Sequence, residues 1–190
     1  MNEAEVRQIF VETGAILEGH FLLTSGLHSP LYVEKFQVLQ HPKHTENLCA
    51  AMAERFKNDN IELVIGPVTG GIILAHEVGK HLGTRAIFTE RENGKMTLRR
   101  GFVIEKGQRV LIVEDIVTTG GSVKEVVDVV REHGGVPVAV GMLVDRSGGK
   151  ADFGIPAQAL LHLTVPTYQS QDCPLCKDGI AITKRGSRKL

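Results

Sequence analysis

Two uninterrupted apolar runs, at residues 110–113 and 136–144, constrain the fold of this chain more than any other feature. A strand that is apolar at consecutive positions buries both faces, which is typical of parallel sheets covered by helices. Amphipathic helical patterns alternate with such runs, as βαβ units require. The alternating segments predict strands at 63–65, 85–89, 110–113 and 136–144 and helices at 72–82 and 122–133. We therefore expect an α/β fold with a central, mostly parallel sheet flanked by helices.

The N-terminal part of the chain follows a different pattern. Asn2 and Glu5 form a capping box, which predicts a helix to about Thr13 that Gly14 ends. Short apolar runs broken by glycine and by Ser-Pro then predict small hairpin strands over residues 14–40. We expect this segment to form a small N-terminal hood appended to the sheet.

Composition restricts the class of protein. The 190 residues, 42% hydrophobic and 23% charged, fit a single domain over residues 1–190, with a C-terminal tail at 167–190. The 22 basic and 22 acidic residues balance, so the overall charge favours neither nucleic acid nor a membrane surface as a partner. No apolar run reaches the roughly 18 residues of a membrane helix. The acidic N-terminus and the odd count of three cysteines favour a cytoplasmic, reducing compartment.

The most informative stretch for function follows the apolar run at 110–113. It consists of two acids and a loop of small residues that leads into the next predicted helix: Glu114, Asp115, Ile116, Val117, Thr118, Thr119, Gly120, Gly121 and Ser122. Backbone N–H groups at such a helix N-terminus can converge on a phosphate. The adjacent carboxylates can accept hydrogen bonds from a sugar diol and stabilise positive charge on the sugar. A tight turn with incidental acids is the alternative, and the ordered combination disfavours it.

This combination resembles the signature of the type I phosphoribosyltransferases, which bind the 5′-phosphate and ribose of phosphoribosyl pyrophosphate there. Further motifs resemble the orotate phosphoribosyltransferases and extend the resemblance over nearly the whole chain: Leu23-Thr24-Ser25-Gly26, Gly66-Pro67-Val68-Thr69-Gly70-Gly71 and Val144-Asp145-Arg146-Ser147-Gly148-Gly149. The resemblance implies the type I phosphoribosyltransferase fold. It also implies transfer of ribose 5-phosphate to orotate in pyrimidine biosynthesis, giving orotidine 5′-phosphate and pyrophosphate. Mg²⁺ would be held mainly by the donor, without a direct protein ligand, and the family's homodimers share their active sites between subunits.

The resemblance assigns residues to the two substrates. The donor site would comprise Thr69, Gly70, Arg91, Lys95, Glu114, Asp115, Ile116, Val117, Thr118, Thr119, Gly120, Gly121 and Ser122. Arg91 and Lys95 match the cationic positions of the family's mobile catalytic loop, and with Asp115 they would be catalytic. The orotate site would comprise Thr118, Arg146 and the hood residues Thr24, Ser25 and Gly26. A guanidinium such as that of Arg146 can bind the orotate carboxylate through two hydrogen bonds.

Two positions depart from the best-known orotate enzymes, which have lysines where this chain has Thr69 and Glu92. The catalytic loop, at 90–101, is also shorter, which indicates a short-loop branch of the family. Arg99 and Arg100 are candidates to replace the missing cations. If the chain had no phosphate loop elsewhere, segment 90–101 would be interpreted as a solvated hairpin around an Asn-Gly turn.

Other interpretations remain open from the sequence. Cys173 and Cys176 form a single Cys-x-x-Cys pair, for which two unremarkable thiols are favoured over a zinc or redox site because His162 has no regular ligand spacing to them. No histidine receives a catalytic role. A non-catalytic regulator that senses phosphoribosyl pyrophosphate is disfavoured by the balanced charge. A purine phosphoribosyltransferase is disfavoured by Arg146 and the hood.

Overall fold

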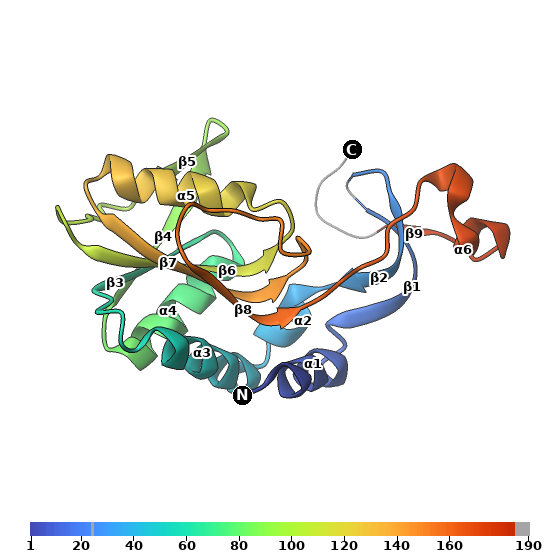
Figure 1. Cartoon of the computed structure of the whole chain (residues 1–190), viewed down its shortest axis with the longest axis horizontal. Coiled ribbons are helices and arrows are strands. Elements are labelled where there is room, and N and C mark those ends of the chain that lie inside the picture. The colour runs from blue at the N-terminus through green and yellow to red at the C-terminus, as the bar shows by residue number, and fades with distance from the viewer. Residues whose placement is uncertain (24, 185–190) are drawn as a thin grey trace.

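A six-stranded sheet forms the centre of the molecule (Figure 1). The computed structural model describes residues 1–23 and 25–184. The strands lie in the order β5-β4-β3-β6-β7-β8, with bounds β3 (Leu63–Pro67), β4 (Arg85–Glu92), β5 (Lys95–Leu98), β6 (Arg109–Val117), β7 (Val136–Asp145) and β8 (Ala157–His162). Neighbouring strands are parallel except the edge strand β5, which is antiparallel to β4. The expected α/β fold with a mostly parallel sheet is confirmed.

Helices cover both faces of this sheet, as Figure 1 shows. Helices α3 (Pro42–Phe56) and α4 (Gly70–Leu82) lie on one face and α5 (Gly121–Glu132) lies on the other. Alternation along β6 explains the two layers. Leu111 and Val113 join the core with residues of α3 and α4, whereas Val110 and Ile112 join the core with the valines of α5. All four side chains are fully buried, as their uninterrupted apolar run predicts.

The N-terminal segment forms the predicted helix and hairpin. Helix α1 (Glu3–Glu12) begins with the Asn2–Glu5 capping box. Strands β1 (Ile16–Leu22) and β2 (His28–Val33) then pair antiparallel. A short helix that the pattern did not indicate, α2 (Lys35–Leu39), follows them. Its five residues are too few to show a helical period.

The hood receives a third strand from the C-terminal segment. After β8 the chain forms the 3-10 turn η1 (Ser170–Asp172), the helix α6 (Pro174–Lys177) and the strand β9 (Thr183–Lys184). Strand β9 pairs in parallel with β1, giving a small sheet in the order β2-β1-β9 (Figure 1). The basic residues beyond Lys184 lie outside the described residues. None of the helices in the described part of the chain has the length and apolar character needed to span a bilayer.

Candidate active site at the carboxyl ends of the strands

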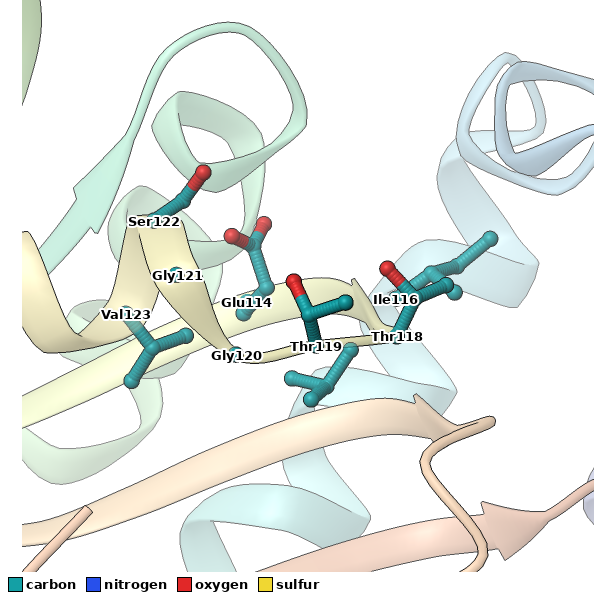
Figure 2. Close-up of a pocket in the computed structure, with 9 residues that line it drawn as sticks. Glu114, Ile116, Thr118, Thr119, Gly120, Gly121, Ser122 and Val123 are labelled. Atoms are coloured by element: carbon teal, nitrogen blue, oxygen red, sulfur yellow. The ribbon is translucent and has the colours of Figure 1, made fainter. Parts of the chain in front are cut away.

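A small hollow lies where strand β6 passes into helix α5. Its volume is about 70 Å³, and it is lined by Glu114, Ile116, Val117, Thr118, Thr119, Gly120, Gly121, Ser122 and Val123. Figure 2 shows the side-chain oxygens of Glu114, Thr119 and Ser122 on one side of the junction, with Val123 on the other. Drug-sized ligands need roughly 300 Å³ or more. The hollow therefore fits one phosphate-sized group at a helix N-terminus, where N–H groups and the helix dipole attract anions.

Gly120 allows the tight turn that forms this hollow. Its φ is +78°, in the left-handed region, and it caps helix α5. A Cβ atom at this position would also lie 2.7 Å from the Phe153 ring. Both facts require glycine here.

The two acids at the end of β6, Glu114 and Asp115, are buried, with exposed fractions of 8% and 2%. Asp115 Oδ1 accepts hydrogen bonds from the Lys35 ammonium at 3.0 Å and from the Ile116 N–H at 2.7 Å. Asp115 Oδ2 lies 2.8 Å from the same ammonium. Both oxygens of this buried carboxylate are therefore close to the Lys35 charge.

Lys35 is a site residue that the sequence analysis missed. It begins the short helix α2 of the hood and reaches an acid 80 residues further along the chain. Nothing in the local sequence around Lys35 indicates this contact. The ion pair depends on how the hood sits over the sheet, which periodicity does not predict.

The two acids have different surroundings. Burial, followed by the negative charge of Asp115, raises the pKa of Glu114 to about 8. Glu114 is therefore mostly protonated near pH 7, while Asp115 is paired with the Lys35 ammonium. The protonated carboxyl of Glu114 can donate a hydrogen bond as well as accept one.

The turn between β3 and α4 packs directly against the acids. A Cβ atom at Gly70 would lie 1.9 Å from Asp115 Oδ2, so a side chain there would displace the carboxylate. Gly66 and Gly71 approach each other so closely that a Cβ atom on Gly66 would lie 2.6 Å from the Gly71 carbonyl oxygen. Thr69 caps helix α4 without a side-chain hydrogen bond to it, and the Val68–Thr69 peptide bond is cis. The predicted pyrophosphate turn and the predicted acid pair thus form one surface.

The segment at 90–101 folds as an antiparallel hairpin at the sheet edge. Strands β4 and β5 pair Glu92 with Lys95, and the two turn residues between them have positive φ angles of 51° and 82°, as a tight hairpin requires. The Arg91 guanidinium donates hydrogen bonds to the Gly94 carbonyl at 2.8 Å and to Glu125 of α5 at 2.9 Å. Arg91 is thereby held about one helical turn along α5 from the phosphate loop.

The other cations of the hairpin do not reach the acids either. Arg99 lies 3.4 Å from Glu92, and Arg100 forms two parallel hydrogen bonds with Glu90. Within the described chain, Lys95 forms no ion pair or hydrogen bond through its side chain. The structure therefore brings together the phosphate loop, the acids and the pyrophosphate turn, but it does not join Arg91 or Lys95 to them.

Arg146 lies on the adjacent strand end. Its backbone N–H donates to the Val117 carbonyl at 2.8 Å, which places Arg146 beside the start of the phosphate loop. Its guanidinium is largely buried, and burial lowers the pKa of this group while nearby Tyr32 of the hood raises it. The buried Nε–H has no hydrogen-bond acceptor among the residues described.

The hood residues assigned to orotate lie at the tip of the β1–β2 hairpin. Ser25 and Gly26 are exposed there, and the Gly26 N–H donates to the Leu23 carbonyl at 2.9 Å. Thr24 lies outside the described residues. No hydrogen bond joins Ser25 or Gly26 to Arg146 in the part of the chain the structure covers. Their role in base binding stays a prediction.

Comparisons with known proteins agree with this geometry. The chain matches the family model described as "Phosphoribosyl transferase domain" over residues 36–153. It is 54% identical to an orotate phosphoribosyltransferase of Desulforamulus reducens and 55% identical to one of Pelotomaculum thermopropionicum, over 190 residues that cover 100% of each chain. It is also similar in structure to orotate phosphoribosyltransferase from Aeropyrum pernix, with a TM-score of 0.71 and 26% identity over 83% of this chain and 93% of that one.

The expected type I phosphoribosyltransferase fold and the resemblance noted in the sequence are both confirmed. The relatives match from end to end, so the hood and the C-terminal segment are covered as well as the sheet. This chain therefore belongs to the orotate phosphoribosyltransferase family, within the type I phosphoribosyltransferases.

Proposed function

We propose that this protein transfers ribose 5-phosphate from phosphoribosyl pyrophosphate to orotate, producing orotidine 5′-phosphate and pyrophosphate for pyrimidine biosynthesis. The observation that carries this proposal is the identity of 54–55%, over the full length of both chains, with relatives named orotate phosphoribosyltransferase. The hollow at the start of α5, the buried acids and the unpartnered donor of Arg146 support it.

The donor would bind across the β6–α5 junction and the β3–α4 turn. Residues 118–122 would hold the 5′-phosphate through backbone N–H groups and hydroxyls. The carboxyls of Asp115 and Glu114 would form hydrogen bonds with the two ribose hydroxyls. As the bond to pyrophosphate breaks, positive charge develops on the sugar. The Asp115 carboxylate would stabilise that charge in a site with little water.

Mg²⁺ would be carried on the oxygens of the donor, where it neutralises charge on the pyrophosphate leaving group. The acid pair fits this arrangement, because burial and the charge of Asp115 raise the pKa of Glu114 and the Lys35 ammonium already lies 2.8 Å from Asp115 Oδ2. Mg²⁺ usually keeps several waters and is bound by one or two carboxylates together with substrate phosphates, so most of its ligands would come from the donor.

Arg146 would select the base. Its guanidinium lies beside the phosphate loop, and its buried Nε–H lacks an acceptor in the described chain. The orotate carboxylate would bind this guanidinium through charge-assisted hydrogen bonds. Uracil and the purines lack that carboxylate, so they would leave the guanidinium without this partner.

We further propose a homodimer in which the β4–β5 hairpin of one subunit completes the site of the other. Within its own chain Arg91 is bound to Glu125, and neither Arg91 nor Lys95 joins the acids. The hairpin forms the edge of the sheet (Figure 1), where a second copy can reach it.

A cytoplasmic location belongs to the same proposal, because all three cysteines are free thiols, as a reducing compartment would keep them.

A panel of bases tests the proposed reaction. The purified chain is incubated with phosphoribosyl pyrophosphate, Mg²⁺ and orotate, uracil, adenine or guanine in turn, and pyrophosphate release is measured. We expect release with orotate and little with the other bases. Release with a purine and none with orotate would contradict the proposal. A folded protein that binds the donor but releases pyrophosphate with none of the bases would be a regulator rather than an enzyme.

A further inference from the structure

Four side chains that the proposed reaction does not use meet in the hood. They are His20 of β1, His28 of β2, Cys173 at the start of α6 and Cys176 within α6. Their potential ligand atoms all lie within 4.8 Å of one another. His20, His28 and Cys173 are buried, with exposed fractions of 3%, 7% and 0%. The sequence favoured two unremarkable thiols at this Cys-x-x-Cys pair, whereas the structure places both thiols beside two buried histidines.

The β1–β2 hairpin brings the two histidines together. Leu22 pairs with His28 across the hairpin, and the register of the pairing shifts between Glu18 and Phe21, where His20 lies. His20 Nε2 lies 2.9 Å from His28 Nδ1. The two histidines lie on the two strands of a hairpin. Their spacing in the sequence therefore does not match the regular ligand spacing of a zinc motif, and the sequence did not reveal them.

The C-terminal segment brings the cysteines to this face. The backbone N–H groups of His28 and Tyr168 each donate to the other's carbonyl at 2.9 Å, which holds the segment against β2. Helix α6 begins six residues after Tyr168, and its first turn presents both thiols to the imidazoles. In Figure 1 α6 lies beyond the β1–β2 hairpin, on the side away from the central sheet. The cluster therefore joins segments that are about 150 residues apart in the chain.

The sulfur–nitrogen distances within the cluster are close to those between ligands of one tetrahedral metal ion. Cys173 Sγ lies 3.6 Å from His20 Nε2, and Cys176 Sγ lies 3.8 Å from that nitrogen and 3.3 Å from His28 Nδ1. The two imidazole nitrogens are 2.9 Å apart. With Zn–S of about 2.3 Å and Zn–N of about 2.0–2.1 Å, a tetrahedral site places sulfur and nitrogen ligands roughly 3.5 Å apart and two nitrogens roughly 3.4 Å apart. A small separation of the imidazoles would complete the site.

A second contact prepares His20 as a ligand. Its Nδ1 lies 2.7 Å from the Ile180 carbonyl oxygen, which can only accept a hydrogen bond. Nδ1 therefore carries the proton, and the lone pair of the neutral ring lies on Nε2, the atom that faces the cluster. Metal-binding histidines in proteins almost always donate their other N–H in this way.

We propose that His20, His28, Cys173 and Cys176 bind a structural Zn²⁺ ion that fastens the C-terminal segment to the β1–β2 hairpin. Two thiolates and two imidazoles in a tetrahedral arrangement are typical of zinc. With four protein ligands the coordination is complete, so the site holds the fold rather than binding a substrate. This proposal is independent of the reaction at the β6–α5 junction, because none of the four residues belongs to that site.

Metal analysis of the full-length protein tests the proposal. Protein purified in reducing buffer and supplied with Zn²⁺ is passed through a desalting column, and its zinc content is measured by mass spectrometry. We expect about one zinc ion per chain. Cys176→Ala removes one ligand at an exposed position, where packing changes little. Loss of a hydrogen bond that supports a metal ligand costs roughly 10- to 100-fold in metal affinity, and loss of the Cys176 ligand itself should lower zinc affinity by more than that.

Cys49→Ala is the matched control, because Cys49 is a free thiol in the core outside the cluster. It should retain zinc at the level of the unmodified protein. A chelator should lower the melting temperature of the unmodified protein and of Cys49→Ala, and added Zn²⁺ should restore it. The melting temperature of Cys176→Ala should not respond to chelator.

Cobalt substitution keeps the test decisive if Cys176→Ala does not fold. Co²⁺ bound by two thiolates in a tetrahedral site produces a thiolate charge-transfer band in the near ultraviolet and intense d–d bands in the visible spectrum. We expect both in the unmodified protein. The proposal is overturned if the reduced, folded protein retains neither zinc nor cobalt, or if Cys176→Ala retains as much zinc as Cys49→Ala.

Discussion

The protonation of single residues determines how the acid pair can act. Glu114 and Asp115 are adjacent and buried, and among the described residues Asp115 forms an ion pair, with Lys35, whereas Glu114 forms none. Burial and the neighbouring charge raise the pKa of Glu114 to about 8. The two acids look equivalent in the sequence, but their surroundings in the folded protein differ.

Glu114→Gln tests this difference through stability. The folded protein keeps a proton on Glu114 that the unfolded chain releases above its ordinary pKa of 4.5. This group therefore lowers the free energy of unfolding as the pH rises from 4.5 to about 8, and not further above that. Gln cannot titrate, so the free energy of unfolding of the variant should not fall in this way. Across this pH window it should rise by at least about 1 kcal/mol relative to that of the unmodified protein, because one pKa unit corresponds to roughly 1.4 kcal/mol. Urea unfolding at several pH values measures this difference. If the free energy of unfolding of both proteins depended on pH in the same way, the raised pKa of Glu114 would be refuted.

Arg146→Ala should selectively impair the use of orotate. The orotate carboxylate would lose its charge-assisted partner, a loss of roughly 2–5 kcal/mol for a desolvated pair, so kcat/KM for orotate should fall about 30-fold or more. Affinity for phosphoribosyl pyrophosphate should change little. Arg146→Lys should recover only part of the loss, because lysine cannot form the two parallel hydrogen bonds.

Arg131→Ala, an exposed arginine at the far end of α5, is the control for this experiment. It should leave both substrates unaffected. Equal weakening of donor and orotate by Arg146→Ala would mean that Arg146 supports the fold instead of reading the base.

Single residues also show what the sequence could and could not predict. Glu114, Asp115 and the loop to Ser122 were identified because strand, acids, glycines and helix follow one another directly in the chain. Lys35 and His28 were missed as partners because their contacts join distant segments. Such contacts depend on strand register and on the placement of the hood, and neither leaves a local pattern.

Between elements, the close packing of two turns shapes the site. The β3–α4 turn approaches the end of β6 so closely that Gly70 lies against the Asp115 carboxylate.

Elements with strong periodicity, such as α5 and β7, were predicted to within a few residues. Strand β5, strand β8 and helix α2 were not predicted, because short or edge elements carry too few residues to establish a period.

Gly70→Ala tests the contact between these turns. The added Cβ atom would lie 1.9 Å from Asp115 Oδ2, so the carboxylate must move. A displacement of about 1 Å at a reacting group can cost roughly 100-fold in rate, and we expect kcat/KM for the donor to fall by that order. Steady-state kinetics and urea unfolding, measured together, separate this effect from a loss of stability.

Gly83→Ala at the other end of the same helix is the matched control. Gly83 has a φ of +68° and open space around it, so alanine there should cost stability through backbone strain but leave the kinetics unchanged. If Gly70→Ala and Gly83→Ala had equal kinetic constants, the close approach to Asp115 would have no role in the reaction.

In the whole molecule, the charged side chains assigned to the proposed reaction lie in two separate regions. The phosphate loop, the acids and Arg146 lie at the strand ends, whereas Arg91 of the hairpin is bound to Glu125 of α5. A dimer that shares its sites would bring the hairpin of one subunit to the acids of the other. The sequence resemblance implied this sharing, but a single chain cannot display it.

Hybrid dimers test the sharing of sites. Arg91→Ala/Lys95→Ala protein and Asp115→Asn protein should each be nearly inactive alone. After subunit exchange, a mixture should recover about a quarter of the unmodified activity, because half of the dimers are mixed and each has one intact site of two. Absence of recovery, despite exchange shown by differently tagged subunits, would exclude a hairpin that acts on the partner.

The most direct measurement of the central claim is the formation of both products by unmodified protein and by Asp115→Asn. With orotate, phosphoribosyl pyrophosphate and Mg²⁺, the unmodified protein should form orotidine 5′-phosphate and pyrophosphate in equal amounts. Asp115→Asn should remain folded and lower the rate about 100-fold or more, as removal of a charge-stabilising group in a catalytic site does. The proposed reaction would be contradicted if folded, unmodified protein formed no orotidine 5′-phosphate, and the proposed role of Asp115 would be contradicted if Asp115→Asn formed it at the unmodified rate.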